Sequence, residues 1–127
     1  MQTQQLLRGC LYSNEVDTMI IKLGQNGEFE FTGPEPLNNW TPPYRAGIYA
    51  IFTEDVTPRH YVTLYIGESE NLSERGFSSH HAYPCWAKNM KRTLYIGTLP
   101  MPNSTSEQRR EIESRLISYH NPSCNQV

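Results

Sequence analysis

Hydrophobic residues alternate with other residues along residues 46–53, and a period of two predicts a β-strand. Ile48, Ala50 and Phe52 point to one side of this strand, and Tyr49 points to the other side. A polar connection follows, so the strand is predicted to form the first half of a hairpin.

The return strand of that hairpin is predicted at 61–67, where the period of two recurs. Tyr65 lies on the face opposite the aliphatic residues of this stretch. Because alternation places Tyr49 and Tyr65 at corresponding sites, the two tyrosines are predicted to share one face of the sheet.

A separate hairpin is predicted at 18–32. Two β-prone runs flank a turn that contains Asn26 and Gly27, and Asn-Gly favours a hairpin turn because both residues tolerate positive φ. Phe29 and Phe31 are expected on one face of its second strand. The weak apolar pattern before it, in residues 1–16, fits a short helix.

Residues 33–43 contain four prolines and predict an irregular joint. Trp40 in this joint has two interpretations, packing against the core or stacking on a ligand. The rest of the chain divides into a short helix at 68–78, an ordered loop at 79–89, a strand at 92–99 and a helix from Ser104 or Thr105 to about His120.

The order strand, strand, helix, strand, helix predicts a compact α/β sandwich over residues 45–127. We expect a central three-stranded mixed sheet flanked by helices, because the helix between the second and third strands allows a crossover connection. Residues 1–44 are expected to form an N-terminal extension that carries the first hairpin.

The net charge of −2 does not indicate a nucleic-acid-binding protein by itself. Residues 1–44 hold two basic and five acidic residues, hence −3, whereas residues 45–127 hold nine basic and eight acidic residues, hence +1. The second part is therefore compatible with a polyanionic partner.

The three cysteines Cys10, Cys85 and Cys124 are odd in number, widely spaced and outside any CxxC motif. We interpret each as a small hydrophobic residue in a reducing, cytoplasmic setting. No leader peptide is predicted at the start, and no apolar run approaches the length of a membrane span.

The sequence contains a series of motifs, in a characteristic order, that resemble those of the GIY-YIG nuclease superfamily. Its two name-giving motifs match Gly47-Ile48-Tyr49 and Tyr65-Ile66-Gly67, and a Gly-x-Ser-x-Asn-Leu-x-x-Arg stretch follows at residues 67–75. A later tripeptide, Tyr95-Ile96-Gly97, lacks this context, so Tyr65 is preferred as the motif tyrosine. The resemblance covers about residues 45–127.

The resemblance implies a site for phosphodiester hydrolysis. Glu113 on the last helix would hold one Mg²⁺ or Mn²⁺ ion, a hard cation suited to oxygen ligands. Arg75 would bind the scissile phosphate, with Asn71 from the same motif also contacting substrate. Tyr49 is favoured as the base that takes the proton from water, with Tyr65 as its partner.

The remaining expected site residues are His80, His81 and Asn125. Either histidine would relay the proton or bind phosphate, and Asn125 would orient the glutamate or close the site. Glu68 departs from the family, many of whose members carry a lysine or a small residue there. It is expected either to join Glu113 at the metal or to cap the predicted helix.

The leading hypothesis is a divalent-metal-dependent endonuclease that cuts DNA by hydrolysis, with RNA left open as a substrate. The alternative is a GIY-YIG-like nucleic-acid-binding module that has lost catalysis. The protein is expected to be a monomer, or a homodimer formed through the N-terminal extension, with no membrane partner.

Overall fold

The computed structural model describes residues 11–12, 19–41, 43–74 and 77–126. In this part of the chain, six strands form one sheet in the order β1-β2-β3-β6-β4-β5. The strands are β1 (Leu11–Tyr12), β2 (Met19–Leu23), β3 (Phe29–Pro36), β4 (Gly47–Glu54), β5 (Tyr61–Ser69) and β6 (Leu94–Pro100). The short helix expected in residues 1–16 lies mostly outside the described residues.

Every strand pairing in the described sheet is antiparallel, so the predicted three-stranded mixed sheet is wrong. The crossover itself occurs, and β5 and β6 run in the same direction. They do not pair, however, because β4 lies between them. The N-terminal hairpin of β2 and β3 is confirmed, and β3 pairs with β6, so this hairpin extends the same sheet.

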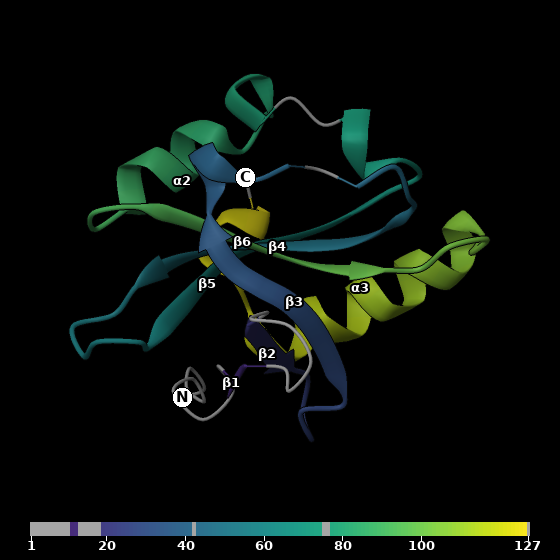
Figure 1. Cartoon of the computed structure of the whole chain (residues 1–127), viewed down its shortest axis with the longest axis horizontal. Helices are drawn as coiled ribbons and strands as arrows, with labels where there is room; N and C mark the ends of the chain where they lie inside the picture. Colours follow the sequence, from purple (N-terminus) through teal and green to yellow (C-terminus); the bar gives the residue numbers. More distant parts are fainter. Residues whose placement is uncertain (1–10, 13–18, 42, 75–76, 127) are drawn as a thin grey trace.

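Two helices cover opposite faces of the sheet, as Figure 1 shows. Helix α2 (Tyr83–Asn89) contributes Trp86 to a core that includes Tyr49 and Ile51. Helix α3 (Ser106–His120) contributes Leu116 to a second core on the other face. The alternation predicted for β4 is therefore confirmed, since odd-numbered and even-numbered residues enter different cores.

The alternation predicted for β5 fails at a β-bulge. Ile51 pairs with Tyr65, whereas the next residue, Phe52, pairs with Thr63, so Leu64 is an additional residue in β5. Leu64 and Tyr65 consequently pack in the same core, on the α2 side, while Ile66 packs on the α3 side.

The segment between β5 and β6 differs from the prediction. Instead of a helix at 68–78, β5 continues through Ser69, which pairs with Gly47. Two short 3₁₀ turns follow, η3 (Leu72–Glu74) and η4 (Phe77–Ser79). The expected loop at 79–89 contains α2, whose first turn holds a proline, a residue that suits the start of a helix.

The predicted last helix is confirmed. Thr105 caps α3, and its side chain accepts a hydrogen bond from the Gln108 backbone while the Gln108 side chain accepts one from Thr105. Asn121 ends the helix in a left-handed conformation with φ of 49°. The 3₁₀ turn η5 (Ser123–Gln126) then returns the chain to the sheet.

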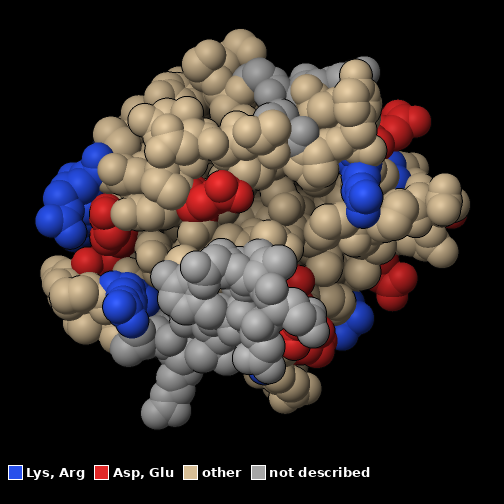
Figure 2. Space-filling view, viewed as in Figure 1, with Lys and Arg blue, Asp and Glu red and all other residues tan. Residues whose placement is uncertain are grey.

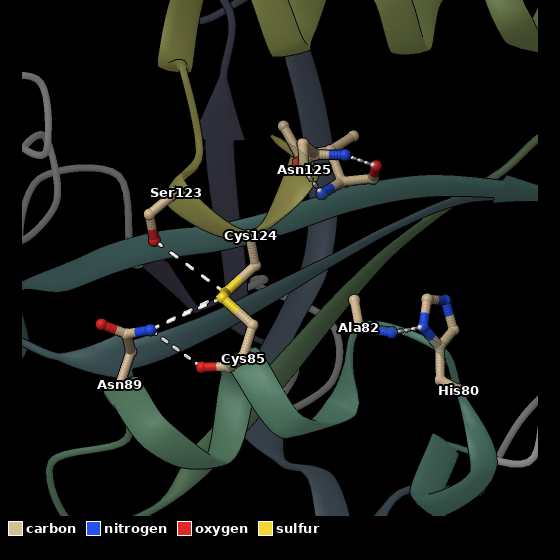
Figure 3. Close-up of a disulfide and its surroundings, with 8 residues drawn as sticks. His80, Ala82, Cys85, Asn89, Ser123, Cys124 and Asn125 are labelled. Carbon is tan, nitrogen blue, oxygen red and sulfur yellow. Dashed lines mark hydrogen bonds between the residues drawn. A yellow bond between two sulfur atoms is a disulfide. The ribbon is translucent and has the colours of Figure 1, made fainter. Parts of the chain in front are cut away.

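The interpretation of the cysteines as isolated hydrophobic residues is wrong for two of the three. Cys85 in α2 and Cys124 in η5 form a disulfide (Figure 3). The sequence separation of 39 residues hid this pairing, because only the fold brings α2 and η5 together. Cys10 lies outside the described residues. Of the helices described, none combines the length and the apolar character needed to span a membrane.

Candidate functional site

The glycines of the two motifs are required by close packing. A Cβ on Gly47 would lie 2.5 Å from the Leu99 carbonyl oxygen. A Cβ on Gly67 would lie 2.6 Å from both Cζ and Oη of Tyr49. The ring of Tyr49 therefore crosses over β5 at Gly67, and its hydroxyl lies above the backbone of that strand.

The hydroxyl of Tyr49 is bound to a buried histidine. Its oxygen lies 2.9 Å from Nε2 of His80, and His80 Nδ1 accepts a hydrogen bond from the Ala82 backbone amide at 3.0 Å (Figure 3). Because Nδ1 accepts, the proton of the neutral ring resides on Nε2. His80 thus donates to the Tyr49 oxygen, which is the arrangement that stabilises a deprotonated tyrosine.

Aromatic rings surround His80 on the α2 side of the sheet. The ring of Tyr65 packs edge-on at 5.0 Å and that of Trp86 lies at 4.7 Å. His81 stacks on His80 at 4.6 Å and is itself exposed. Tyr49 and Tyr65 share this face as predicted, and their ring centroids are 6.0 Å apart. They do not occupy corresponding sites, however, because Tyr49 pairs with Gly67 and Tyr65 pairs with Ile51.

Strand β5 forms one edge of the described sheet, and two residues from the end of the chain bind its outer edge. Both the N–H and the carbonyl of Ile66 bond to the side chain of Asn125, at 2.9 and 2.8 Å. Two residues further along β5, the backbone amide of Glu68 donates a hydrogen bond to the Glu113 carboxylate. Successive outward groups of a strand are about 7 Å apart. Asn125 and Glu113 are thus neighbours along this edge.

The carboxyl group of Glu113 is suited to a divalent cation. Partial burial raises its pKa, the nearby charge of Glu68 raises it further, and Arg110 and the Glu68 amide oppose the shift. A desolvated carboxylate beside a second negative charge is stabilised by a cation. Among the described residues, no three His, Cys, Asp or Glu side chains lie close enough together to hold a metal ion.

Glu68 neither caps a helix nor stands unpaired. Its Oε1 accepts a hydrogen bond from Nε of Arg109 at 2.7 Å, and Arg110 lies 4.0 Å from its other oxygen. The Arg109 side chain is only 4% exposed and also donates to Ser104. Glu68 and Arg109 are 41 residues apart in the sequence, so local spacing gave no signal for this pair.

Tyr95, in the second copy of the tripeptide, lies on the opposite face from Tyr49. It packs in the core on the α3 side, and its hydroxyl donates to Glu54 at 2.9 Å. Desolvation by burial, followed by its bond to Glu54, raises its pKa. The two copies of the tripeptide therefore place their tyrosines on opposite faces of the sheet.

The expected phosphate-binding stretch is described only in part. Asn71 accepts hydrogen bonds from the backbone and the hydroxyl of Ser73, which shapes the turn after β5. Arg75 lies outside the described residues. The structure thus brings together Tyr49, Tyr65, His80 and His81 on the α2 face, with Glu113 and Asn125 along the adjoining edge of β5.

Comparison with known proteins gives one structural similarity. No family model matches the sequence, and no curated protein matches it. The chain is similar to a crystal structure of a point mutant of the GIY-YIG N-terminal endonuclease domain of UvrC from Thermotoga maritima, bound to its catalytic divalent cation. The identity is 22%, the TM-score is 0.48, and the match covers 66% of this chain and 86% of that one. At these values the similarity assigns no residue role and no activity to this protein.

Proposed function

We propose that this protein is a divalent-metal-dependent endonuclease that hydrolyses phosphodiester bonds in DNA. One observation carries the proposal. The Tyr49 hydroxyl lies over Gly67 and is bonded to His80, one residue along β5 from the amide that contacts Glu113. A proton acceptor and a cation-binding carboxylate thus lie beside the same short stretch of one strand.

Tyr49 is the proposed general base. His80 donates from Nε2 to the tyrosine oxygen, so this oxygen keeps a hydrogen-bond partner after it loses its proton. The Ala82 amide holds the imidazole in the required tautomer. Tyr49 is buried, so its position is maintained by packing before any substrate binds.

Glu113 is the proposed ligand of one Mg²⁺ or Mn²⁺ ion. When bound, such an ion polarises the phosphate and neutralises charge that develops on it. Glu68 lies close enough to raise the pKa of Glu113, but its own charge is balanced by Arg109. The proposed contact with the cation therefore depends on Glu113.

The remaining roles follow the motif. Arg75 binds the scissile phosphate and Asn71 supports the same substrate contact. Tyr65 and His81 position the base, since their rings pack against His80. Asn125 holds the edge of β5 at Ile66 and so fixes the strand that carries Tyr65 and Gly67.

The test is a supercoiled-plasmid nicking assay with Mg²⁺ or Mn²⁺. We expect nicking by the wild type, none by Glu113→Ala or Arg75→Ala, and strongly reduced nicking by Tyr49→Phe. Removal of a general base typically lowers the rate of the catalysed reaction about 10²–10⁴-fold. Chelation of the divalent ions is expected to stop the wild type.

Two matched controls are available in the chain. Tyr95→Phe removes the same hydroxyl from the other copy of the tripeptide, on the opposite face, and is expected to nick normally. Glu111→Ala removes an exposed carboxylate of the same helix and is also expected to be active. If the wild type binds DNA without nicking, the protein is the inactive binding module instead.

A further inference from the structure

A pocket adjoins the proposed catalytic tyrosine on the α2 side of the sheet. Its volume is about 460 Å³, within the roughly 300–1,000 Å³ typical of ligand sites. Four segments distant in sequence line it, namely η2 (Leu37–Asn39), η4, α2 and the start of β6. The mechanism proposed above uses none of its lining residues.

Three aromatic side chains, Trp40, Phe77 and Tyr83, line this pocket. The rings of Trp40 and Phe77 are 5.4 Å apart and tilted by 57°, so they do not stack face to face. Trp40 packs against the core on the α2 side and is only partly buried, so it also lines the pocket. Met90 is also exposed at the rim. The pocket therefore offers aromatic surface to a ligand.

The polar groups of the pocket fit an uncharged heterocycle that is linked to a phosphate. Arg92 is the charged residue among those that line it, and its side chain is 82% exposed. Asn38, Ser78 and Thr93 also line the pocket, and their amide and hydroxyl groups are of the kind that can hydrogen-bond to the edge of a base. In Figure 2, basic and acidic side chains lie together at the edge where Figure 1 shows the loop between α2 and β6, while the top of this view is mainly uncharged.

One ring connects this pocket to the catalytic centre. Phe77 lines the pocket and packs edge-on against Tyr49, with ring centroids 5.5 Å apart. The proposed phosphate-binding residue, Arg75, precedes Phe77 by two residues in the sequence. Phe77 therefore contacts the ring of Tyr49 and also lines the pocket.

We infer that this pocket holds one unstacked nucleobase of the substrate, so that the preferred substrate contains an unpaired base. The inference rests on the proposed nuclease function. Bases stack on aromatic rings regardless of their identity, whereas a base inside an intact duplex is already stacked and cannot enter. The pocket accordingly selects for nucleic-acid structure and not for sequence.

The experiment measures binding in the presence of EDTA, where no cleavage occurs. The probes are a fully paired DNA duplex, the same duplex with a one-nucleotide bulge, and the bulged duplex with an abasic nucleotide in the bulge. We expect the bulged duplex to bind at least about five-fold more tightly than the other two, the lower end of the effect of stacking one base. Trp40→Ala is expected to abolish this preference.

Trp40→Phe keeps an aromatic ring and is expected to retain most of the preference, which shows whether loss in Trp40→Ala reflects misfolding. Tyr44→Ala is the matched control, since Tyr44 is 85% exposed but does not line this pocket. A 2-aminopurine in the bulge reports stacking directly, and its fluorescence is expected to fall on binding to the wild type but not to Trp40→Ala.

The outcomes separate the two proposals. Equal binding of the bulged and paired duplexes, unchanged by Trp40→Ala, overturns the base pocket and leaves the nuclease function in place if plasmid is still nicked. A preference for the bulged duplex that Trp40→Ala does not reduce also overturns it. If no nucleic acid binds even at low salt, the nuclease function and the base pocket both fail.

Discussion

The disulfide is expected to contribute a large part of the stability of this protein. It joins α2 to η5 across 39 residues of sequence, and Cys124 is fully buried. In the chain-entropy model, closing a loop of about 40 residues destabilises the unfolded state by roughly 4 kcal/mol at 25 °C. Reduction, or the double variant Cys85→Ala/Cys124→Ala, removes this contribution.

Urea unfolding of the oxidised and reduced wild type measures the effect. With a denaturant dependence of about 2 kcal/mol per molar urea, a loss of 4 kcal/mol moves the midpoint by roughly 2 M. Cys10→Ser is the control and is expected to unfold like the oxidised wild type. Thiol titration of the denatured, unreduced protein is expected to find one thiol, since two of the three cysteines are bridged.

A local measurement connects the disulfide to the site. Cys124 is adjacent to Asn125, whose carboxamide binds both backbone groups of Ile66. Reduction is therefore expected to accelerate hydrogen exchange at the Ile66 amide more than at amides in the middle of α3. Finding three thiols, or equal midpoints for the oxidised and reduced protein, would refute the argument.

Three further predictions concern single side chains. Gly67→Ala is expected to lower the free energy of unfolding by about 1–3 kcal/mol, because the new methyl overlaps the Tyr49 ring. It is also expected to remove most of the nicking activity. Unfolding and nicking assays test both effects. Burial lowers the pKa of His120 to about 4. Neutral His120 therefore stabilises the fold above pH 6.5, and as much as about 3 kcal/mol of the free energy of unfolding is lost as the pH falls towards 4. The unfolding midpoint measured against pH tests this prediction. Because burial and Glu68 raise the pKa of Glu113, cation affinity measured by titration calorimetry is expected to weaken on acidification sooner than at an ordinary carboxylate.

His120→Gln, which keeps an acceptor for the Gly24 amide, is the control for the pH prediction and is expected to remove most of that acid sensitivity. An unfolding midpoint that is flat between pH 6.5 and 4 in the wild type would contradict the assignment. For Gly67→Ala, Gly97→Ala is the comparison, since a Cβ there meets the nearest atom at 3.3 Å and is expected to be better tolerated.

The sequence by itself determined several of the local elements and suggested the candidate site residues. Period-two alternation identified β4 and placed Tyr49 and Tyr65 on one face, and the Asn-Gly turn identified the β2–β3 hairpin. These signals are short-range, because the turn and the side-chain direction depend on neighbouring residues. The motifs likewise selected Tyr65 over Tyr95, and the two tyrosines lie on opposite faces.

Only the tertiary structure decided which distant groups meet. The insertion of β6 between β3 and β4, the pairing of Glu68 with Arg109 and the bridge from Cys85 to Cys124 all join segments separated by about 40 residues or more. Such contacts form because the chain returns across the sheet, and no periodicity within either segment encodes the partner. The same holds for Asn125, which was expected from the sequence to orient the glutamate or close the site and which the fold places against the backbone of Ile66.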